Sequence, residues 1–219
     1  RNLPACGQYR AGCGCAVHSG RPLACRLYPL GRRYQGGTVR YFHEGEHFPC
    51  LDGCKEVMEL PHLTVSEYLE GQGTAAGEAA QDAYLRLVEE LSEGALVLLI
   101  DSGLAASGDR QTLPAWQELG ALPPDGRAAR IPGDWLDMLT VPDLRMPLSD
   151  PAAYVSAHHQ LLQARAQADF ASLDAPERLR QASCLMLALA LHLGQSLGAE
   201  PAPLAQKWIS IARQNGASG

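Results

Sequence analysis

The sequence predicts a mainly α-helical protein that begins with an irregular, cysteine-rich module. Two observations lead to this fold class. Six of the seven cysteines lie within the first 54 residues, in a stretch that is dense in glycine and has no sustained helical period. From about residue 75 onward, apolar residues recur at helical spacing in several segments. We therefore expect a module over residues 1–60 and a helical domain over residues 61–219.

Composition and charge argue against a membrane-spanning protein and against a nucleic-acid-binding protein. The chain has 219 residues, of which 46% are hydrophobic, and no apolar run approaches the roughly 20 residues that cross a bilayer. The formal charge is −6, and the longest basic run is the pair Arg32-Arg33. A nucleic-acid binder would need a larger basic patch to neutralise phosphates. We expect a soluble, cytoplasmic protein with neither a nucleic-acid nor a membrane partner.

The module is expected to consist of loops and short strands. Residues 38–43 are rich in β-branched and aromatic side chains and follow two glycines, which predicts a short strand or hairpin arm. The rest of the module carries few large apolar groups. A segment of this size buries too little surface to fold alone, so it needs a cross-link or a bound metal.

The helical domain is expected to open with two helices. Thr64 and Glu67 have the spacing of a capping box, and the helix that they start is interrupted by the glycines at 71 and 73. An amphipathic helix then runs from Ala75 to Leu91 and ends at Gly94. The apolar run 95–100 is either a short strand or the start of another helix.

The second half is expected to consist of a connection followed by three helices. Residues 113–151 contain seven prolines and predict a long connection, with short helices around Trp116 and Trp135, that crosses the helices as a lid or strap. A helix begins at Asp150-Pro151 and runs to about residue 173. The next contains the apolar stretch 184–193 and is expected to be the central buried helix, and a final helix covers residues 203–214.

The cysteine spacing is the strongest chemical signal. It is C-x6-C-x-C-x9-C-x24-C-x3-C, without the paired C-x2-C of common zinc fingers. Reduced thiolates in such a group bind zinc, iron or an iron–sulfur cluster. The alternative is an oxidised scaffold with three disulfides, which would leave the seventh cysteine unpaired. The predicted ligands are the six clustered cysteines, namely Cys15, Cys25, Cys50 and Cys54, with Cys6 and Cys13 as additions. Cys184 lies in an apolar helix and is assigned to the core.

Two segments carry a family resemblance. Residues 15–29 have the sequence C-A-V-H-S-G-R-P-L-A-C-R-L-Y-P, and residues 64–73 have the sequence T-V-S-E-Y-L-E-G-Q-G. With Cys50 and Cys54 between them, they resemble the zinc/iron-chelating, YkgJ-like cysteine-cluster proteins over residues 13–73. The resemblance implies a bacterial, cytoplasmic metal or iron–sulfur protein, and some relatives are linked to flagellin lysine N-methylation. The family usually opens with a C-x2-C-x2-C-C-type group, whereas here only Cys6 and Cys13 precede Cys15.

Several arginines and histidines are further candidates for functional or structural roles. Arg21 or Arg26 is expected to offset the charge of a thiolate site; alternatively, the arginines are solvated or pair with carboxylates. Residues 43–47 match H-E-x-x-H, but the central Gly45 and the nearby Pro49 favour a turn over the helix that a hydrolytic zinc site needs. Of the neighbours His158 and His159, one is expected to be exposed and the other partly buried.

The expected function is binding of zinc or iron, including an iron–sulfur cluster, as a structural or redox centre, with the helical part contacting a protein or peptide partner. The alternative is a metal-dependent enzyme that modifies a protein or peptide side chain. No nucleotide-binding or hydrolase motif is present, so neither a nucleotide cofactor nor a catalytic residue is assigned.

Overall fold

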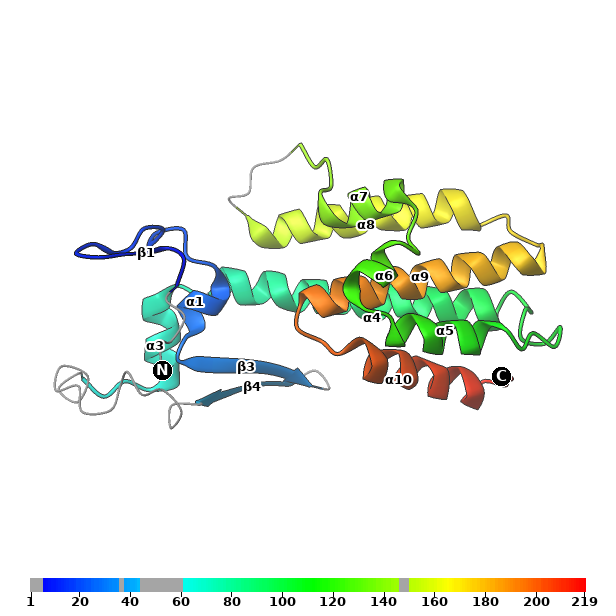
Figure 1. Ribbon diagram of the computed structural model, residues 1–219, viewed down its shortest axis with the longest axis horizontal. Coiled ribbons are helices and arrows are strands. Elements are labelled where there is room, and N and C mark those ends of the chain that lie inside the picture. Colours follow the sequence, from blue (N-terminus) through cyan, green and yellow to red (C-terminus); the bar gives the residue numbers. More distant parts are fainter. Residues whose placement is uncertain (1–5, 36–37, 44–60, 146–149) are drawn as a thin grey trace. The chain divides into compact units, whose positions relative to one another are not determined.

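The computed structural model describes residues 6–35, 38–43, 61–145 and 150–219, and it is mainly helical (Figure 1). The predicted mainly α class is therefore confirmed. Contacts between residues divide the chain into two units, Arg1–Glu78 and Ala79–Gly219. The predicted boundary at residue 60 lies at the end of a segment outside the described residues, and the contacts group residues 61–78 with the first unit.

The first unit has two small hairpins and two short helices among its described residues. Both hairpins are antiparallel, and in the second one Leu30 lies opposite His43. The predicted strand over residues 38–43 is confirmed as one arm of that hairpin. In chain order the elements are β1 (Tyr9–Arg10), β2 (Gly14–Cys15), α1 (Leu23–Leu27), β3 (Leu30–Gln35), β4 (Thr38–His43) and α3 (Val65–Gln72).

Helix α3 begins and ends as local sequence chemistry dictates. The Thr64 hydroxyl accepts a hydrogen bond from the Glu67 amide at 3.2 Å, and the Glu67 carboxylate accepts from the Thr64 amide at 2.8 Å. The predicted capping box is confirmed. Gly73 ends the helix in the left-handed conformation, with φ of 60°, a backbone conformation that glycine adopts without a steric penalty. The glycine at position 71, by contrast, lies within the helix.

Helix α4 (Ala75–Ile100) continues past the predicted end at Gly94, so that prediction is wrong, and residues 95–100 are helical. The buried positions keep their helical spacing from Leu87 to Leu99, which extends the apolar stripe. A Cβ atom at position 94 would lie 2.8 Å from the Cε of Met186. Gly94 therefore permits close packing against a neighbouring helix rather than terminating its own.

Residues 113–151, predicted as a long connection, contain α5 (Thr112–Ala121), α6 (Pro124–Ala128) and α7 (Gly133–Thr140). The short helices expected around Trp116 and Trp135 are confirmed, and both indoles are buried in the core. These residues are thus part of the core and not a strap over it. The prolines at 124 and 132 stand at helix starts, where a missing amide donor has no cost.

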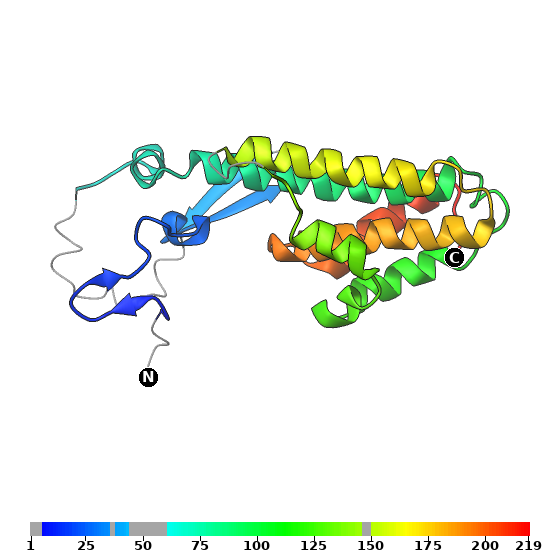
Figure 2. The same ribbon diagram turned by 90° about the horizontal axis from the view of Figure 1, so that it is seen from above.

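The last three helices agree with the sequence prediction. They are α8 (Pro151–Phe170), α9 (Pro176–Ser196) and α10 (Pro201–Gln214), and the Asp150 carboxylate caps α8 by accepting from the Ala153 amide at 3.0 Å. Helix α9 contacts α5, α6, α7 and α10 and is the central buried helix, as expected. Helix α8 runs alongside α4 (Figure 2), where His159 pairs with Glu90 at 2.5 Å.

Candidate functional site

The described cysteines of the first unit lie on loops and short elements. Cys6 precedes β1, Cys13 lies in the turn between β1 and β2, Cys15 lies on β2, and Cys25 lies in α1. None of these four forms a disulfide; three are exposed, and Cys15 is half-buried. All four thiols are therefore accessible to a ligand or an oxidant.

The turn around Cys13 is built by glycines. Gly12 and Gly14 both have left-handed backbone conformations, with φ of 81° and 77°. The Cys13 amide donates to the Arg10 carbonyl at 3.1 Å, and the Tyr9 amide donates to the Cys6 carbonyl at 2.9 Å. Backbone hydrogen bonds and glycine conformations thus shape this hairpin, and the Cys13 side chain in its turn is exposed.

The helix that carries Cys25 is fixed by the guanidinium of Arg26. Its Nε donates to the Arg21 carbonyl at 3.0 Å, one Nη donates to the Gln72 carbonyl at 2.9 Å, and the other donates to the Ser19 carbonyl at 2.9 Å. The Gln72 carbonyl is among the last of α3, where no amide of the helix itself remains to pair with it. Arg26 therefore ties the loop before α1 to the C-terminal end of α3.

Arg21 and Tyr68 add to this junction. The Arg21 Nη donates to the side-chain oxygen of Gln72 at 3.1 Å, and the Tyr68 hydroxyl donates to the Tyr28 carbonyl. Among the residues that the structure describes, the partners of the two arginines are carbonyls and an amide side chain rather than carboxylates or thiolates. The two segments that carry the family resemblance, residues 15–29 and 64–73, are in direct contact through these bonds.

A second polar cluster fixes the β3–β4 hairpin to the first turn of α4. The Glu78 carboxylate accepts from the Tyr41 hydroxyl at 2.5 Å and from the Thr74 hydroxyl at 3.0 Å, and it lies 3.3 Å from the Arg32 Nε. Burial, followed by the hydrogen bond to Glu78, raises the pKa of Tyr41 above its usual value. Tyr41 therefore remains a neutral donor over the physiological range.

These anchoring residues were only partly foreseeable. Gln72 falls inside the segment that resembles the family, although its role in binding two arginines had no sequence signal. Glu78 lies in the first turn of a helix, where acidic residues are common, so nothing singled it out.

The described residues include side chains that can bind a metal, but by themselves they do not form a complete metal site. Within residues 6–35, 38–43, 61–145 and 150–219, no three His, Cys, Asp or Glu side chains lie close enough to hold a metal ion. The predicted ligands Cys50 and Cys54 lie outside the described residues, as does most of the H-E-x-x-H segment. The thiols that are described suit zinc or iron by donor type.

Cys184 differs from the other described cysteines. It lies on α9, half-buried and packed against the core, as expected from its apolar neighbours. Burial raises the pKa of its thiol to about 11, so it stays protonated at neutral pH. A protonated thiol is a poor metal ligand, which separates Cys184 from the cluster.

Comparisons with protein-family models, with curated proteins and with solved structures find no match for this chain. The resemblance described above therefore stays a prediction. In the part of the chain that the structure describes, no helix combines the length and the apolar character needed to cross a membrane.

Proposed function

We propose that the first unit binds zinc or iron, the latter alone or as an iron–sulfur cluster, through cysteine thiolates. Cys15, Cys25, Cys50 and Cys54 are the main proposed ligands, with Cys6 and Cys13 as additional ones. One observation carries the proposal: among the described residues of this unit, Leu27 is the only buried hydrophobic side chain, while the cysteines are free. The described part of this unit thus has unpaired thiols and almost no apolar core.

The free energies of burial and hydrogen bonding in the described part of this unit favour additional stabilisation by a bound metal. Burying one leucine contributes about 1.5–3 kcal/mol, and each net hydrogen bond of the two polar clusters adds about 1 kcal/mol. Ordering the backbone costs about 1–2 kcal/mol for every residue fixed. A structural zinc site supplies about 10–16 kcal/mol at neutral pH, several times the contribution of one buried leucine.

Metal analysis of anaerobically purified protein tests the proposal. We expect stoichiometric zinc or iron, with visible absorption if the iron forms a cluster, and loss of most of that metal in Cys25→Ser. Cys184→Ser is the matched control, because it removes a cysteine from the helical unit, and it should retain the full metal content. Protein without stoichiometric metal, or equal metal content in both variants, would contradict the proposal.

A further inference from the structure

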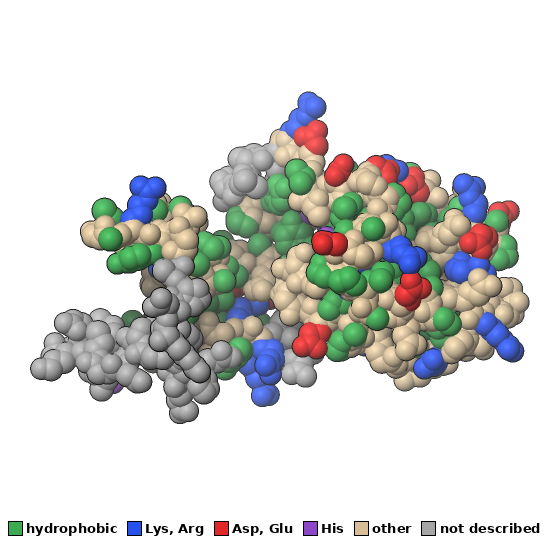
Figure 3. All heavy atoms as spheres, in the orientation of Figure 1, with side chains coloured by type: hydrophobic (Ala, Val, Ile, Leu, Met, Phe, Trp, Pro, Cys, Tyr) green, Lys and Arg blue, Asp and Glu red, His purple; other side chains and the backbone are tan. Residues whose placement is uncertain are grey.

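The β3–β4 hairpin carries two arginines directly opposite each other on one face. In its antiparallel register Arg33 lies opposite Arg40, and Gly31 lies opposite Phe42. Opposed residues of a hairpin share a face, and so do alternate residues of each strand. These four residues therefore form one face, which we call the arginine face. Both arginines and the Phe42 ring are exposed, and basic side chains over the hairpin are visible in Figure 3.

The opposite face of the hairpin is already occupied. Arg32 and Tyr41 also lie opposite each other, one position along each strand, so their side chains belong to the other face. Both contact the Glu78 carboxylate, and the Arg32 side chain is only 4% exposed. One cross-strand pair thus anchors the hairpin, while the neighbouring pair presents two cations to solvent.

Phe42 positions one of these two cations. A Cβ atom at position 31 would collide with the Phe42 ring, so the ring covers the backbone of Gly31. The Arg33 guanidinium lies 5.4 Å from the centre of that ring, within the range of cation–π attraction. A guanidinium that is already positioned loses less side-chain freedom when an anion binds to it.

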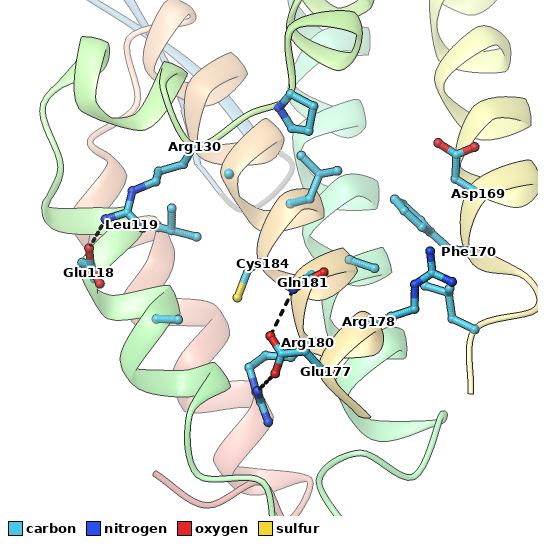
Figure 4. Close-up of a pocket in the computed structure, with 16 residues that line it drawn as sticks. Glu118, Leu119, Arg130, Asp169, Phe170, Glu177, Arg178, Arg180, Gln181 and Cys184 are labelled. Atoms are coloured by element: carbon cyan, nitrogen blue, oxygen red, sulfur yellow. Dashed lines mark hydrogen bonds and ion pairs between the residues drawn. The ribbon is translucent and has the colours of Figure 1, made fainter. Parts of the chain in front are cut away.

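The described residues provide no acidic partner for the arginine face. Neither the Arg33 nor the Arg40 side chain forms a hydrogen bond or an ion pair with a described residue. Two arginines beside a cavity next to α9 differ in this respect, because Arg130 binds Glu118 and Arg180 is also paired with acidic residues (Figure 4). Like charges directly opposite each other destabilise a sheet, and an anion bound between them removes that repulsion.

We propose that the arginine face binds an acidic peptide segment of a partner protein through two carboxylates. A guanidinium can bind a carboxylate by two parallel hydrogen bonds. The Cβ atoms of opposed residues are about 5 Å apart, and alternate residues of an extended peptide are about 6.7 Å apart on one face. Arginine side chains are long enough to span this difference. A Glu-x-Glu segment therefore places one carboxylate on each guanidinium.

The small number of cations favours a short peptide over a long polyanion. A nucleic acid is bound by many phosphate contacts, whereas the arginine face offers two guanidiniums. The formal charge of the whole chain is −6, which also opposes the approach of a polyanion. A peptide with two or three carboxylates matches the arginine face and requires no wider basic surface.

An NMR titration of the full chain with the peptide T-E-V-E-V-E-T tests the proposal. We expect saturable shifts in the amides of β3 and β4, none in α9 and α10, and binding about tenfold weaker for T-Q-V-Q-V-Q-T. An exposed ion pair contributes at most about fivefold in affinity, so Arg33→Gln and Arg40→Gln should each weaken binding about threefold to fivefold. Arg178→Gln is the matched control, since Arg178 is an exposed arginine of the second unit, and it should bind like the parent.

Charge reversal tests the same face in the other direction. The combined variant with Arg33→Glu and Arg40→Glu should lose the acidic peptide and bind T-K-V-K-V-K-T, while its amide spectrum reports whether the hairpin stays folded. No shifts in β3 and β4, equal binding of the glutamine peptide, tighter binding of oligothymidylate, or equal weakening by Arg178→Gln would overturn the proposal. Metal content is measured on the same sample. Peptide binding without metal would contradict only the function proposed above, and metal without peptide binding would contradict only this inference.

Discussion

The two units of this protein differ in the interactions that stabilise each of them internally. The described part of the first unit buries a single hydrophobic side chain and relies on Arg26 and Glu78, which each gather three polar contacts. The second unit buries a continuous cluster of apolar residues around α9, including Trp116, Trp135 and Trp208. Burial scales with apolar area, whereas each net hydrogen bond adds only about 1 kcal/mol. The second unit is therefore expected to be stable alone, and the first is not.

The largest single-residue effect is expected in the apolar core. Trp116→Ala removes a fully buried indole from α5 and should lower the free energy of unfolding of the second unit by about 3–5 kcal/mol. Val97→Ala, at a position that is 51% exposed on α4, should change it by less than about 0.5 kcal/mol. Urea denaturation followed by circular dichroism measures both. A cost for Trp116→Ala no larger than that of Val97→Ala would mean that the core is misassigned.

A smaller effect is expected from the main polar junction of the first unit. Arg26→Lys keeps the charge but removes the planar fork that reaches three carbonyls, so it should cost about 2 kcal/mol of local stability. Hydrogen exchange of amides in α1 and α3 measures this cost. Arg10→Lys alters an exposed arginine without a side-chain partner among the described residues and should leave exchange unchanged. Equal exchange in the two variants would contradict a structural role for Arg26.

One glycine within a helix of each unit shows the same difference in packing. Gly94→Ala brings a methyl group within 2.8 Å of the Met186 Cε and should destabilise the second unit by about 1 kcal/mol, because the thioether has some freedom to move away. Gly71→Ala meets no atom within 4 Å and should stabilise α3 by about 0.5–1 kcal/mol. Denaturation and hydrogen exchange report the two changes. Stabilisation by both substitutions would show that helix propensity, and not packing against Met186, governs Gly94.

The smallest expected effect is a pH dependence in the second unit. His158 is buried, with its Nδ1 3.1 Å from the Tyr84 hydroxyl and its Nε2 2.9 Å from the Met138 carbonyl, and burial lowers its pKa below 6.5. Below pH 6.5 the unfolded chain therefore binds more protons than the folded one, so stability falls as pH falls toward the folded pKa. Denaturation between pH 7 and 5 should show a shallower loss for His158→Gln than for the parent. An equally steep loss would assign the dependence to other groups.

The parts that the sequence predicted well depend on local or periodic signals. The capping box at Thr64, the proline at the start of α8 and the apolar run of α9 are each sufficient to define an element. Gly94 was wrongly interpreted as a helix end, and residues 113–151 were wrongly interpreted as a strap over the helices, because glycine and proline often end helices. At Gly94, packing against Met186 decides the outcome, and at residues 124 and 132 the prolines begin helices. The packing at Gly94 depends on a tertiary contact that a linear pattern does not encode, whereas a proline at a helix start is a local feature.

The residue types of the candidate site were predictable from the sequence, but the hydrogen bonds that position its elements were not. A cluster of cysteines can be recognised directly in a sequence, so the ligand set could be proposed. The junction between Arg26 and Gln72 joins residues 46 positions apart, and the contact between Tyr41 and Glu78 joins residues 37 positions apart. Neither pair has a sequence pattern. A cavity beside α9, lined also by α5 and the C-terminal end of α8, was not foreseen, because residues distant in the sequence form its walls.

The most direct test of the central claim is hydrogen exchange of the full chain before and after metal removal by a thiol-compatible chelator. A metal that supports the first unit predicts that protection of α1, α3 and the β3–β4 hairpin is lost on chelation, while α5, α9 and α10 keep theirs. Unchanged protection in the first unit after complete metal removal would contradict the account, because it would show that the polar junctions suffice without a bound metal.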